Sequence, residues 1–340
     1  MEPSEIIHGF STLNRQEKIR RTASFTDHPR DFFILMEKIW KWDPLLSNPL
    51  SDISENVISG YCLPYSIAPN FLINGKYYMV PMVTEESSVV AAASAAAKYW
   101  FTRGGFHCQV AGMIKPGNIH FLWKNSKQKI SRFIEDISAG LRESAGMTEN
   151  AMRARGGGIQ DVILHDLNHL QKGYFRLEIL FDTVDAMGAN FINTCLEEMA
   201  QYITKRATEQ GISEDLEIIM AILSNYTPEC LVACKISCAL DDLNENSALS
   251  GREFARRFEA AVNIASADIS RAVTHNKRIM NGIDAVLIAT GNDYRAVEAG
   301  IHAWASRNTR YRGLSKAEVN SKEFNLSMEV PLPVGVVGGL

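Results

Sequence analysis

Lys277 and Asp293 are the residues whose types and spacing first suggest chemistry. Lys277 follows the polar residues Thr274-His275-Asn276, which we interpret as a loop, and Asp293 ends the turn Gly291-Asn292-Asp293 before a helical pattern. The apolar run 285–289 between them predicts a short buried strand, whose turns would return both side chains to one pocket. A lysine beside a carboxylate in a partly dry pocket can stabilise an oxyanion. The alternative is a surface ion pair without catalytic function.

Two other groups of residues could bind a metal. His165 and His169 are four residues apart with Asp166 between them, a zinc-hydrolase arrangement if the segment is helical. Its flanks are strand-like, so we interpret the segment as a turn. Cysteines also fall every fourth residue in the run CLVACKISC, and we expect them to line one face of a strand instead of binding a soft metal: Cys230, Cys234 and Cys238. No metal site is predicted.

The composition is that of an ordinary globular protein and excludes several classes of function. The 340 residues are 46% hydrophobic and 22% charged with a net charge of −4, and they are enough for two domains. Without a long basic run, we expect no binding to nucleic acid or to an anionic membrane. No apolar run approaches the ~20 residues that span a bilayer, and the N-terminus MEPSEIIHGF is not a signal peptide. Cysteines without paired spacings favour the reducing cytoplasm.

The elements before residue 108 are predicted to be helices and one hairpin. Amphipathic patterns predict helices over 11–23 and 30–42. Asn74-Gly75 lies between two strand-like runs, a sequence typical of a tight hairpin turn. The Ala-rich run 85–101 predicts a helix that another backbone can approach closely. Glu85 and Glu86 would stand at its N-terminus, where a carboxylate is favoured.

Residues 108–223 have a different texture. GNIHFLW, DVILH and YFRLEILFD read as strands, the last two joined by a hairpin, and Ser126–Ala145 reads as a polar helix. This order predicts a small α+β sheet domain, and no G-x-G-x-x-G follows a strand, so a Rossmann fingerprint is absent. The turn 185–190, DAMGAN, leads from a strand into a helix whose free N–H groups could hold a pyrophosphate. Beyond it, LEIIMAIL and CLVACKIS predict strands, and 251–264 and 266–273 predict helices.

Long motifs in one order from about residue 53 resemble hydroxymethylglutaryl-CoA reductase, specifically its soluble bacterial class II branch. The resembling stretches are Glu55-Asn56-Val57-Ile58, Leu63-Pro64-Tyr65 through NFLING, VPMVTEESSVVAAAS, DAMGAN at 185–190, LSN at 223–225, THNKRIMNGID at 274–284, ATGNDYRAVEAG at 289–300 and PLPVGVVGG at 331–339.

The resemblance implies a fold and an assembly. The fold is α+β, with a discontinuous large substrate domain, 1–107 and 224–340, and an inserted small non-Rossmann sheet domain for the dinucleotide, 108–223. It implies a tight homodimer or higher homo-oligomer with a shared active site, in which Glu86 and Lys277 can come from different subunits. The membrane anchor of the eukaryotic branch is absent, which agrees with a cytoplasmic protein.

The implied reaction is a four-electron interconversion of hydroxymethylglutaryl-CoA with mevalonate plus CoA, using two nicotinamide hydrides. The family's catalytic residues match Glu86, Lys277 and Asp293. Lys277 would stabilise the oxyanion. Glu86, held protonated by the nearby aspartate, would donate a proton to the aldehyde oxygen. Asp293 would keep Lys277 charged and tune the protonation of Glu86. Arg271 matches the contact to the substrate carboxylate, a bidentate task suited to arginine. Three further positions match the substrate pocket: Ser88, Asn225 and Asn281.

The family's dinucleotide-binding loop matches DAMGAN, with the residues Asp185, Met187, Gly188 and Asn190. Glu149 falls where NAD-using relatives carry an acidic residue on the adenosine ribose. A carboxylate there would accept a hydrogen bond from the 2′-OH and repel a 2′-phosphate, so NAD is preferred over NADP. The alternative for Glu149 is a solvated helix end.

The family also has a C-terminal helical domain whose histidine protonates the departing CoA thiolate. That domain follows the Val-Gly-Gly segment, and the given sequence stops at Leu340. We interpret it as a shortened chain, or as a homologue that lacks this domain. The alternative function is therefore a catalytically incomplete homologue that binds acyl-CoA and dinucleotide. Whether a cell uses the reaction to make or to degrade mevalonate stays open.

Overall fold

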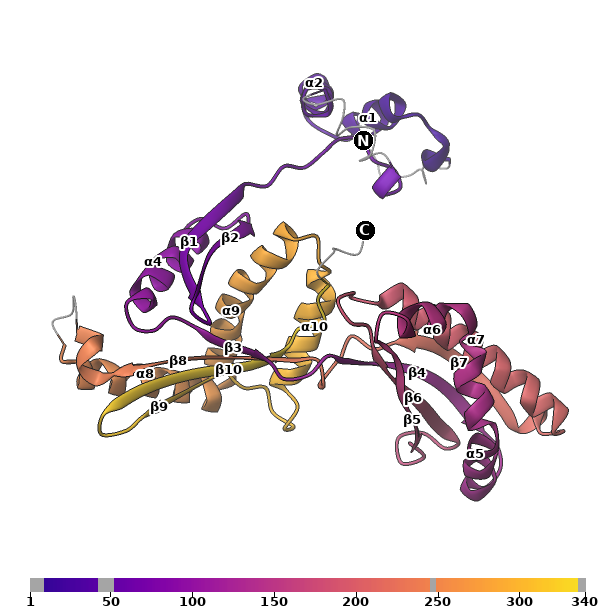
Figure 1. Ribbon diagram of the computed structural model, residues 1–340. Helices are drawn as coiled ribbons and strands as arrows, with labels where there is room; N and C mark the ends of the chain where they lie inside the picture. The colour runs from indigo at the N-terminus through magenta and orange to yellow at the C-terminus, as the bar shows by residue number, and fades with distance from the viewer. Residues whose placement is uncertain (1–8, 42–51, 245–248, 336–340) are drawn as a thin grey trace. The chain divides into compact units, whose positions relative to one another are not determined.

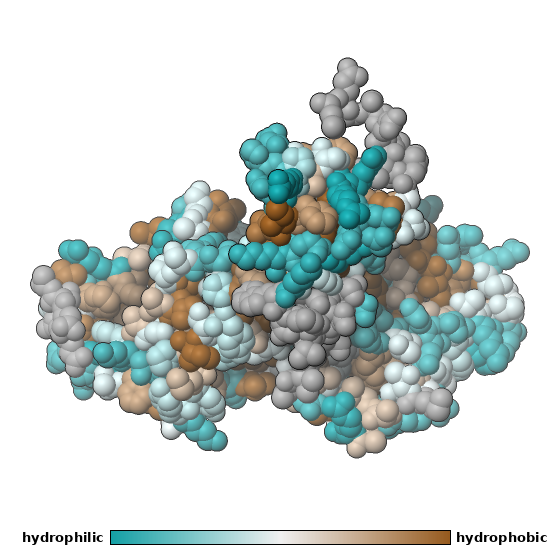
Figure 2. Space-filling model, turned by 90° about the horizontal axis from the view of Figure 1, so that it is seen from above, coloured by the Kyte–Doolittle hydropathy of each residue, from teal (hydrophilic) through white to brown (hydrophobic). Residues whose placement is uncertain are grey.

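The computed structural model describes residues 9–41, 52–244 and 249–335. Its α+β class agrees with the class predicted from the sequence. By compactness the chain falls into two units, Met1–Pro64 and Tyr65–Leu340, which are taken one at a time. In the described segments, no helix is both long and apolar enough to cross a membrane. Hydrophilic and hydrophobic residues are intermixed on the face shown in Figure 2.

The first unit contains two predicted helices after a short 3-10 turn, Phe10–Thr12. Helix α1 (Arg15–Ala23) begins with a capping box, in which the Asn14 side chain accepts from the backbone of Glu17 and the Glu17 side chain accepts from Asn14. Helix α2 (Pro29–Trp40) has proline at its first position, where no backbone hydrogen bond is lost. An ion pair between Arg15 and Glu37 joins the two helices.

The second unit contains a four-stranded antiparallel sheet (Figure 1), and this sheet has a hydrophobic core of its own. In spatial order its strands are β5 (Gly158–Asp166), β6 (Tyr174–Asp182), β4 (Ile114–Trp123) and β7 (Leu216–Leu223). The helices packed on it are α5 (Lys127–Ser144), α6 (Gly146–Arg153) and α7 (Ala189–Glu209). Alternate residues of β6 enter the core, among them Leu177 and Ile179. All members of this core lie within 119–223, which supports the proposed small domain 108–223.

A second four-stranded sheet combines segments that come before and after the first sheet in the sequence. In spatial order its strands are β3 (His107–Val110), β8 (Leu231–Ala239), β10 (Glu323–Pro331) and β9 (Ser315–Val319), all antiparallel. Helix α8 (Gly251–Ala267) packs on it through Ala255 and Val262, against Phe324. The predicted strand CLVACKIS is confirmed as β8, in which Cys234 and Cys238 point to the same face, whereas Cys230 comes just before the strand.

The hairpin of β1 (Tyr65–Ile73) and β2 (Lys76–Val83) confirms the predicted turn at Asn74-Gly75. Both turn residues have positive φ, 50° and 76°. Helix α4 (Val89–Phe101) follows the hairpin but begins later than predicted, so Glu85 and Glu86 precede it in a turn. Its first turn cannot extend back to Glu86 because Ser88 has a left-handed backbone, φ 69°.

Two predictions around Lys277 are wrong. Residues 274–276 are not a loop and 285–289 are not a strand, because both belong to the single helix α9 (Ile269–Ala289). Asp268 caps this helix by accepting from the backbone of Arg271 at 3.0 Å. Four of its five buried residues recur at helical spacing: Ala272, Asn276, Met280 and Leu287. The helix predicted after Gly291 is confirmed as α10 (Tyr294–Ala305).

Candidate active site

Glu86, Lys277 and Asn281 form one polar cluster. Lys277 and Asn281 are one turn apart on α9 and therefore share a face of the helix. The ammonium of Lys277 pairs with Glu86 Oε2, and Asn281 Nδ2 donates to the same oxygen at 3.1 Å. The side chains of Lys277 and Glu86 are 59% and 46% exposed, so a ligand can reach the cluster.

Packing of the hairpin on α9 holds this cluster together. Met82 of β2 and Ala285 of α9 are both 2% exposed and share an apolar core with Ala68. The chain leaves β2 two residues after Met82, and Thr84 Oγ1 accepts from the backbone N–H of Glu86 at 3.2 Å. Ser88 lies two residues further on, where its hydroxyl donates to the carbonyl of Ser87 at 2.5 Å. The hairpin thus fixes where Glu86 meets α9.

The electrostatics of the cluster correct the expected protonation of Glu86. The hydrogen bond from Lys277 lowers the pKa of Glu86, and the charge of Lys277 and the Asn281 amide lower it further. Glu86 is therefore a carboxylate at neutral pH in the free protein. The prediction that it is held protonated is wrong for this state, because its neighbour is a cation and Asp293 is elsewhere.

Asp293 is not part of this cluster within one chain. Its carboxylate caps α10 by accepting from the backbone of Ala296 at 3.1 Å, and it lies 3.6 Å from Arg295. In the described part of the chain it makes no hydrogen bond or ion pair with Lys277 or Glu86. Ala289 comes twelve residues after Lys277 on α9, which is about 18 Å along the helix axis. A straight helix cannot fold back to close that distance.

In the described part of the chain, neither Asn225 nor Arg271 makes a hydrogen bond or ion pair with Glu86. The carbonyl of Asn225 approaches Gly300 of α10 so closely that a Cβ there would stand 2.6 Å away, which places Asn225 with the helix that Asp293 caps. Arg271 lies in the first turn of α9, near His275, whose pKa is lowered by burial and then by the charge of Arg271. The predicted site is therefore divided: Glu86, Lys277, Asn281 and Ser88 lie together, whereas Asp293 caps α10 and Asn225 approaches Gly300 further along that helix.

Asp284 is a candidate residue that sequence reasoning missed. It lies seven residues after Lys277, on the same face of α9 as Lys277 and Asn281. Burial, followed by the charge of Glu298, raises the pKa of Asp284 to about 6. Its Oδ1 is buried without a hydrogen bond. The helical spacing from Lys277 would have indicated it, had α9 been recognised as one helix.

The loop 183–190 is shaped to present the N-terminus of α7. Gly188 precedes the helix with φ 84°, and a Cβ there would overlap the methyl group of Thr183. Lys115, only 4% exposed, donates to Thr183 Oγ1 at 2.5 Å and to the carbonyl of Ala186 at 2.9 Å. Burial lowers the pKa of Lys115. Sequence reasoning missed this lysine, because nothing in its neighbourhood distinguishes it from a solvated one.

The remaining loop residues are more accessible. Asp185 pairs with Arg155, and the side chain of Asp185 is 52% exposed. Asn190 is exposed in the first turn of α7, where backbone N–H groups are free, and Met187 is partly buried. This donor set fits a pyrophosphate, since an anion is favoured at a helix N-terminus.

Glu149 is buried, so the alternative of a solvated helix end is wrong. It lies on α6, 7% exposed, beside Arg153 at 3.6 Å. Gly158 passes so near that a Cβ there would stand 2.8 Å from Glu149 Oε1. Gly157, next to it, packs against Val184 at the start of the loop 183–190. The glycine run 156–158 thus contacts both Glu149 and the loop 183–190.

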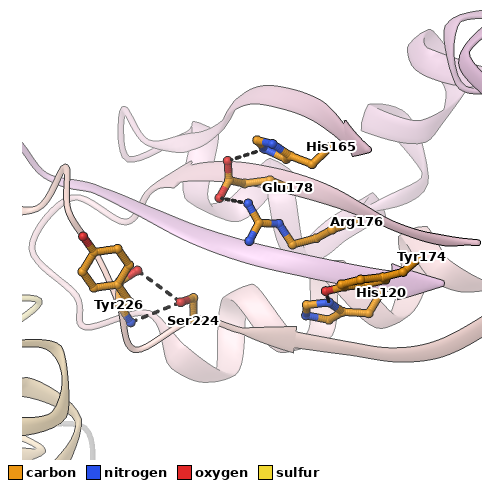
Figure 3. A network of polar contacts seen from close by, with 7 residues as sticks. All are labelled: His120, His165, Tyr174, Arg176, Glu178, Ser224 and Tyr226. Atoms are coloured by element: carbon orange, nitrogen blue, oxygen red, sulfur yellow. Dashed lines mark hydrogen bonds and ion pairs between the residues drawn. The ribbon is translucent and has the colours of Figure 1, made fainter. Parts of the chain in front are cut away.

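The histidines of the zinc alternative do not lie on a helix. His165 is in β5 and pairs with Glu178 of β6 at 2.9 Å, and Arg176 reaches the other carboxylate oxygen at 3.4 Å (Figure 3). His169 is in the turn that follows, as the sequence predicts. Among the described residues, no group of three or more His, Cys, Asp or Glu side chains could hold a metal.

The fold is similar to that of solved oxidoreductases that act on an acyl-CoA. A class II 3-hydroxy-3-methylglutaryl-CoA reductase from Streptococcus pneumoniae, bound to NADPH in open conformations, matches with a TM-score of 0.80 and 36% identity. The match covers 98% of this chain and 87% of that one. A second structure of the Streptococcus pneumoniae enzyme matches with a TM-score of 0.79 over 97% and 76% of the two chains.

Sequence comparison gives the family. The sequence model of the family hydroxymethylglutaryl-coenzyme A reductase matches residues 36–340 of this chain. The reductase of Archaeoglobus fulgidus is 35% identical over 99% of this chain and 73% of its own length. A probable reductase of Borreliella burgdorferi is 30% identical over 99% and 75%. The chain belongs to the hydroxymethylglutaryl-CoA reductase family, which confirms the family and the main function predicted from the sequence.

Proposed function

We propose that the Glu86–Lys277–Asn281 cluster is the place where hydroxymethylglutaryl-CoA is reduced to mevalonate and CoA, or mevalonate is oxidised in the reverse direction. The observation that carries the proposal is the direct contact of these three side chains, which come from segments 191 residues apart. Two nicotinamide dinucleotides, bound one after the other, would each supply one hydride. The chain's own residues then have to bind the thioester, stabilise the oxyanion and deliver protons.

Lys277 is the proposed oxyanion stabiliser. Its ammonium stands beside Glu86, and Asn281 offers a second N–H donor from the same helix face. When hydride adds to the thioester carbonyl, the new alkoxide would be stabilised by the charge of Lys277 and hydrogen bonds from both residues. Collapse of the hemithioacetal releases the CoA thiolate and the aldehyde.

Glu86 is the proposed proton donor in the second reduction, provided that its pKa rises when substrate binds. Lys277 keeps the pKa of Glu86 low in the free protein, so the carboxylate has no proton to give. Bound substrate that excludes water and draws Lys277 toward its own oxygen would raise the pKa of Glu86. Glu86 would then donate to the aldehyde oxygen as the second hydride adds.

Asp293 is proposed to complete the site of a second copy of the chain. Within one chain it lies beyond the far end of α9 from Lys277, at the start of α10. In a twofold dimer, Lys277 of each chain could meet Asp293 of the other chain, so that both sites are completed in the same interface. The shared homodimeric site is thus retained, but with Glu86 and Lys277 from one chain and Asp293 from the other.

The loop 183–190 is the proposed dinucleotide site, with Asp185, Met187, Gly188 and Asn190 around the N-terminus of α7. The relative from Streptococcus pneumoniae that binds NADPH supports a nicotinamide cofactor here. Preference for NAD rests on Glu149 alone, whose carboxylate would favour a 2′-OH. Arg271 and Ser88 are proposed to contact the substrate. The cytoplasmic location stays a prediction.

The test is loss of absorbance of NADH, and separately NADPH, with hydroxymethylglutaryl-CoA and the 340-residue chain. We expect turnover, and Lys277→Ala should lower kcat by about 100- to 1,000-fold while dinucleotide binding persists. Full activity of Lys277→Ala would overturn the assignment. Saturable binding of both ligands without turnover would instead favour the incomplete binding homologue.

A further inference from the structure

Cys108 and Cys234 stand directly opposite each other on the paired strands β3 and β8, with their sulfurs 3.3 Å apart. The backbone N–H of Cys108 donates to Asn74 Oδ1, and its carbonyl accepts from Asn74 Nδ2, both at 2.8 Å. Both backbone groups of Cys108 therefore point away from β8. This makes the two cysteines a non-hydrogen-bonded pair, in which side chains are closest and the Cα atoms are about 4.5 Å apart. That separation lies within the range of disulfides.

No other pair of sulfurs is in contact in the described chain. Cys62 is exposed, Cys195 and Cys230 are buried, and Cys238 lies opposite Phe324 on β10. Both members of the close pair are partly exposed, and Cys108 is on the edge strand of its sheet. Hydrogen bonding between the thiols lowers the pKa of Cys108 to about 7 and raises that of Cys234. Cys108 is thus the more nucleophilic of the two at neutral pH.

We propose that Cys108 and Cys234 are a reversible dithiol–disulfide site, oxidised by low-molecular-weight disulfides such as oxidised glutathione. The thiolate of Cys108 attacks one sulfur of the oxidant, forming a mixed disulfide and releasing one glutathione thiolate. Cys234 then loses its proton and its sulfur attacks Cys108 Sγ, which releases the second glutathione. Two protein thiols are oxidised, and one glutathione disulfide is reduced to two thiols.

The position of the pair gives the bond a structural consequence. Cys108 precedes the first strand of the small sheet, and Cys234 follows its last strand, 126 residues later. A disulfide would therefore cross-link the two strands through which the chain enters and leaves that sheet. Cross-links that close long loops stabilise most, because they remove the most freedom from the unfolded chain. Oxidation should raise the midpoint of thermal unfolding.

The test treats the reduced full-length chain with oxidised glutathione and maps its peptides without reduction. We expect a Cys108–Cys234 cross-linked peptide that has lost two hydrogen atoms, is restored by dithiothreitol and accompanies a higher thermal midpoint. Cys234→Ser should trap glutathione on Cys108, because the resolving thiol is missing. Cys238→Ser, on the same strand and face, is the matched control and should cross-link as the parent does.

Exposed Cys62 reports whether the oxidant has reacted, because its thiol is freely accessible. Full modification of Cys62 without a Cys108–Cys234 cross-link would overturn the proposal. So would a stable glutathione adduct on Cys108 in the parent chain, or an equal yield of cross-linked protein from Cys108→Ser.

Discussion

The division of the predicted site within one chain can be tested with mixed dimers. Lys277→Ala and Asp293→Ala should each lower kcat by about 100- to 1,000-fold as pure proteins, the cost of removing one group that stabilises the transition state. If each site takes Lys277 from one chain and Asp293 from the other, a mixed dimer of the two variants has one intact site and one doubly damaged site. Such a dimer should recover about half of the parent activity, since a twofold dimer has two equivalent sites.

The assay uses two affinity tags on co-expressed variants, so that only mixed dimers survive tandem purification before the NADH and NADPH measurement. Glu86→Ala with Lys277→Ala is the matched control. Those residues are in contact within one chain, so both sites of that mixed dimer are damaged and no recovery is expected. The shared site would be refuted if the mixed Lys277→Ala/Asp293→Ala dimer were no more active than the mean of the two pure variants. A chain that forms no dimer would also refute it.

Three further changes test single residues. The folded-state pKa of Asp284, about 6, exceeds its ordinary 3.8, so stability should fall as pH rises through that window. Asp284→Asn should remove this dependence and raise the free energy of unfolding by about 1 kcal/mol above pH 7, allowing for partial exposure, in urea titrations at pH 4 and pH 8. Gly188→Ala should weaken NADPH binding by at least about tenfold in a fluorescence titration. Gly211→Ala is the control and should leave binding unchanged, because Gly211 has φ 67° but open space around it. Equal affinities of the two variants would contradict the role of the loop 183–190. Glu149→Gln should raise kcat/KM for NADPH relative to NADH by about tenfold, and an unchanged ratio would exclude Glu149 as the selector.

The sequence predicted most strands and the hairpin because their signals are local. Asn74-Gly75 specifies its turn, and β6 of the small sheet alternates buried core residues with partly exposed ones. The contact of Glu86 with Lys277 has no such signal, since 191 residues separate them, and only the family resemblance indicated it. The contacts of Lys115 depend on strand register, and so does the pairing of Cys108 with Cys234. A single sequence does not display register.

The error around Lys277 has a physical cause with a consequence for function. A polar triplet followed by the apolar run 285–289 looks like a loop and a buried strand, because five apolar residues are too few to distinguish a strand period from a helical one. The Asp268 cap and the buried residues spaced along 272–287 instead make one rigid helix. A loop and strand would have allowed Lys277 and Asp293 to meet in one pocket of one chain. The continuous helix separates them, and this separation is why the proposed site needs a second copy of the chain.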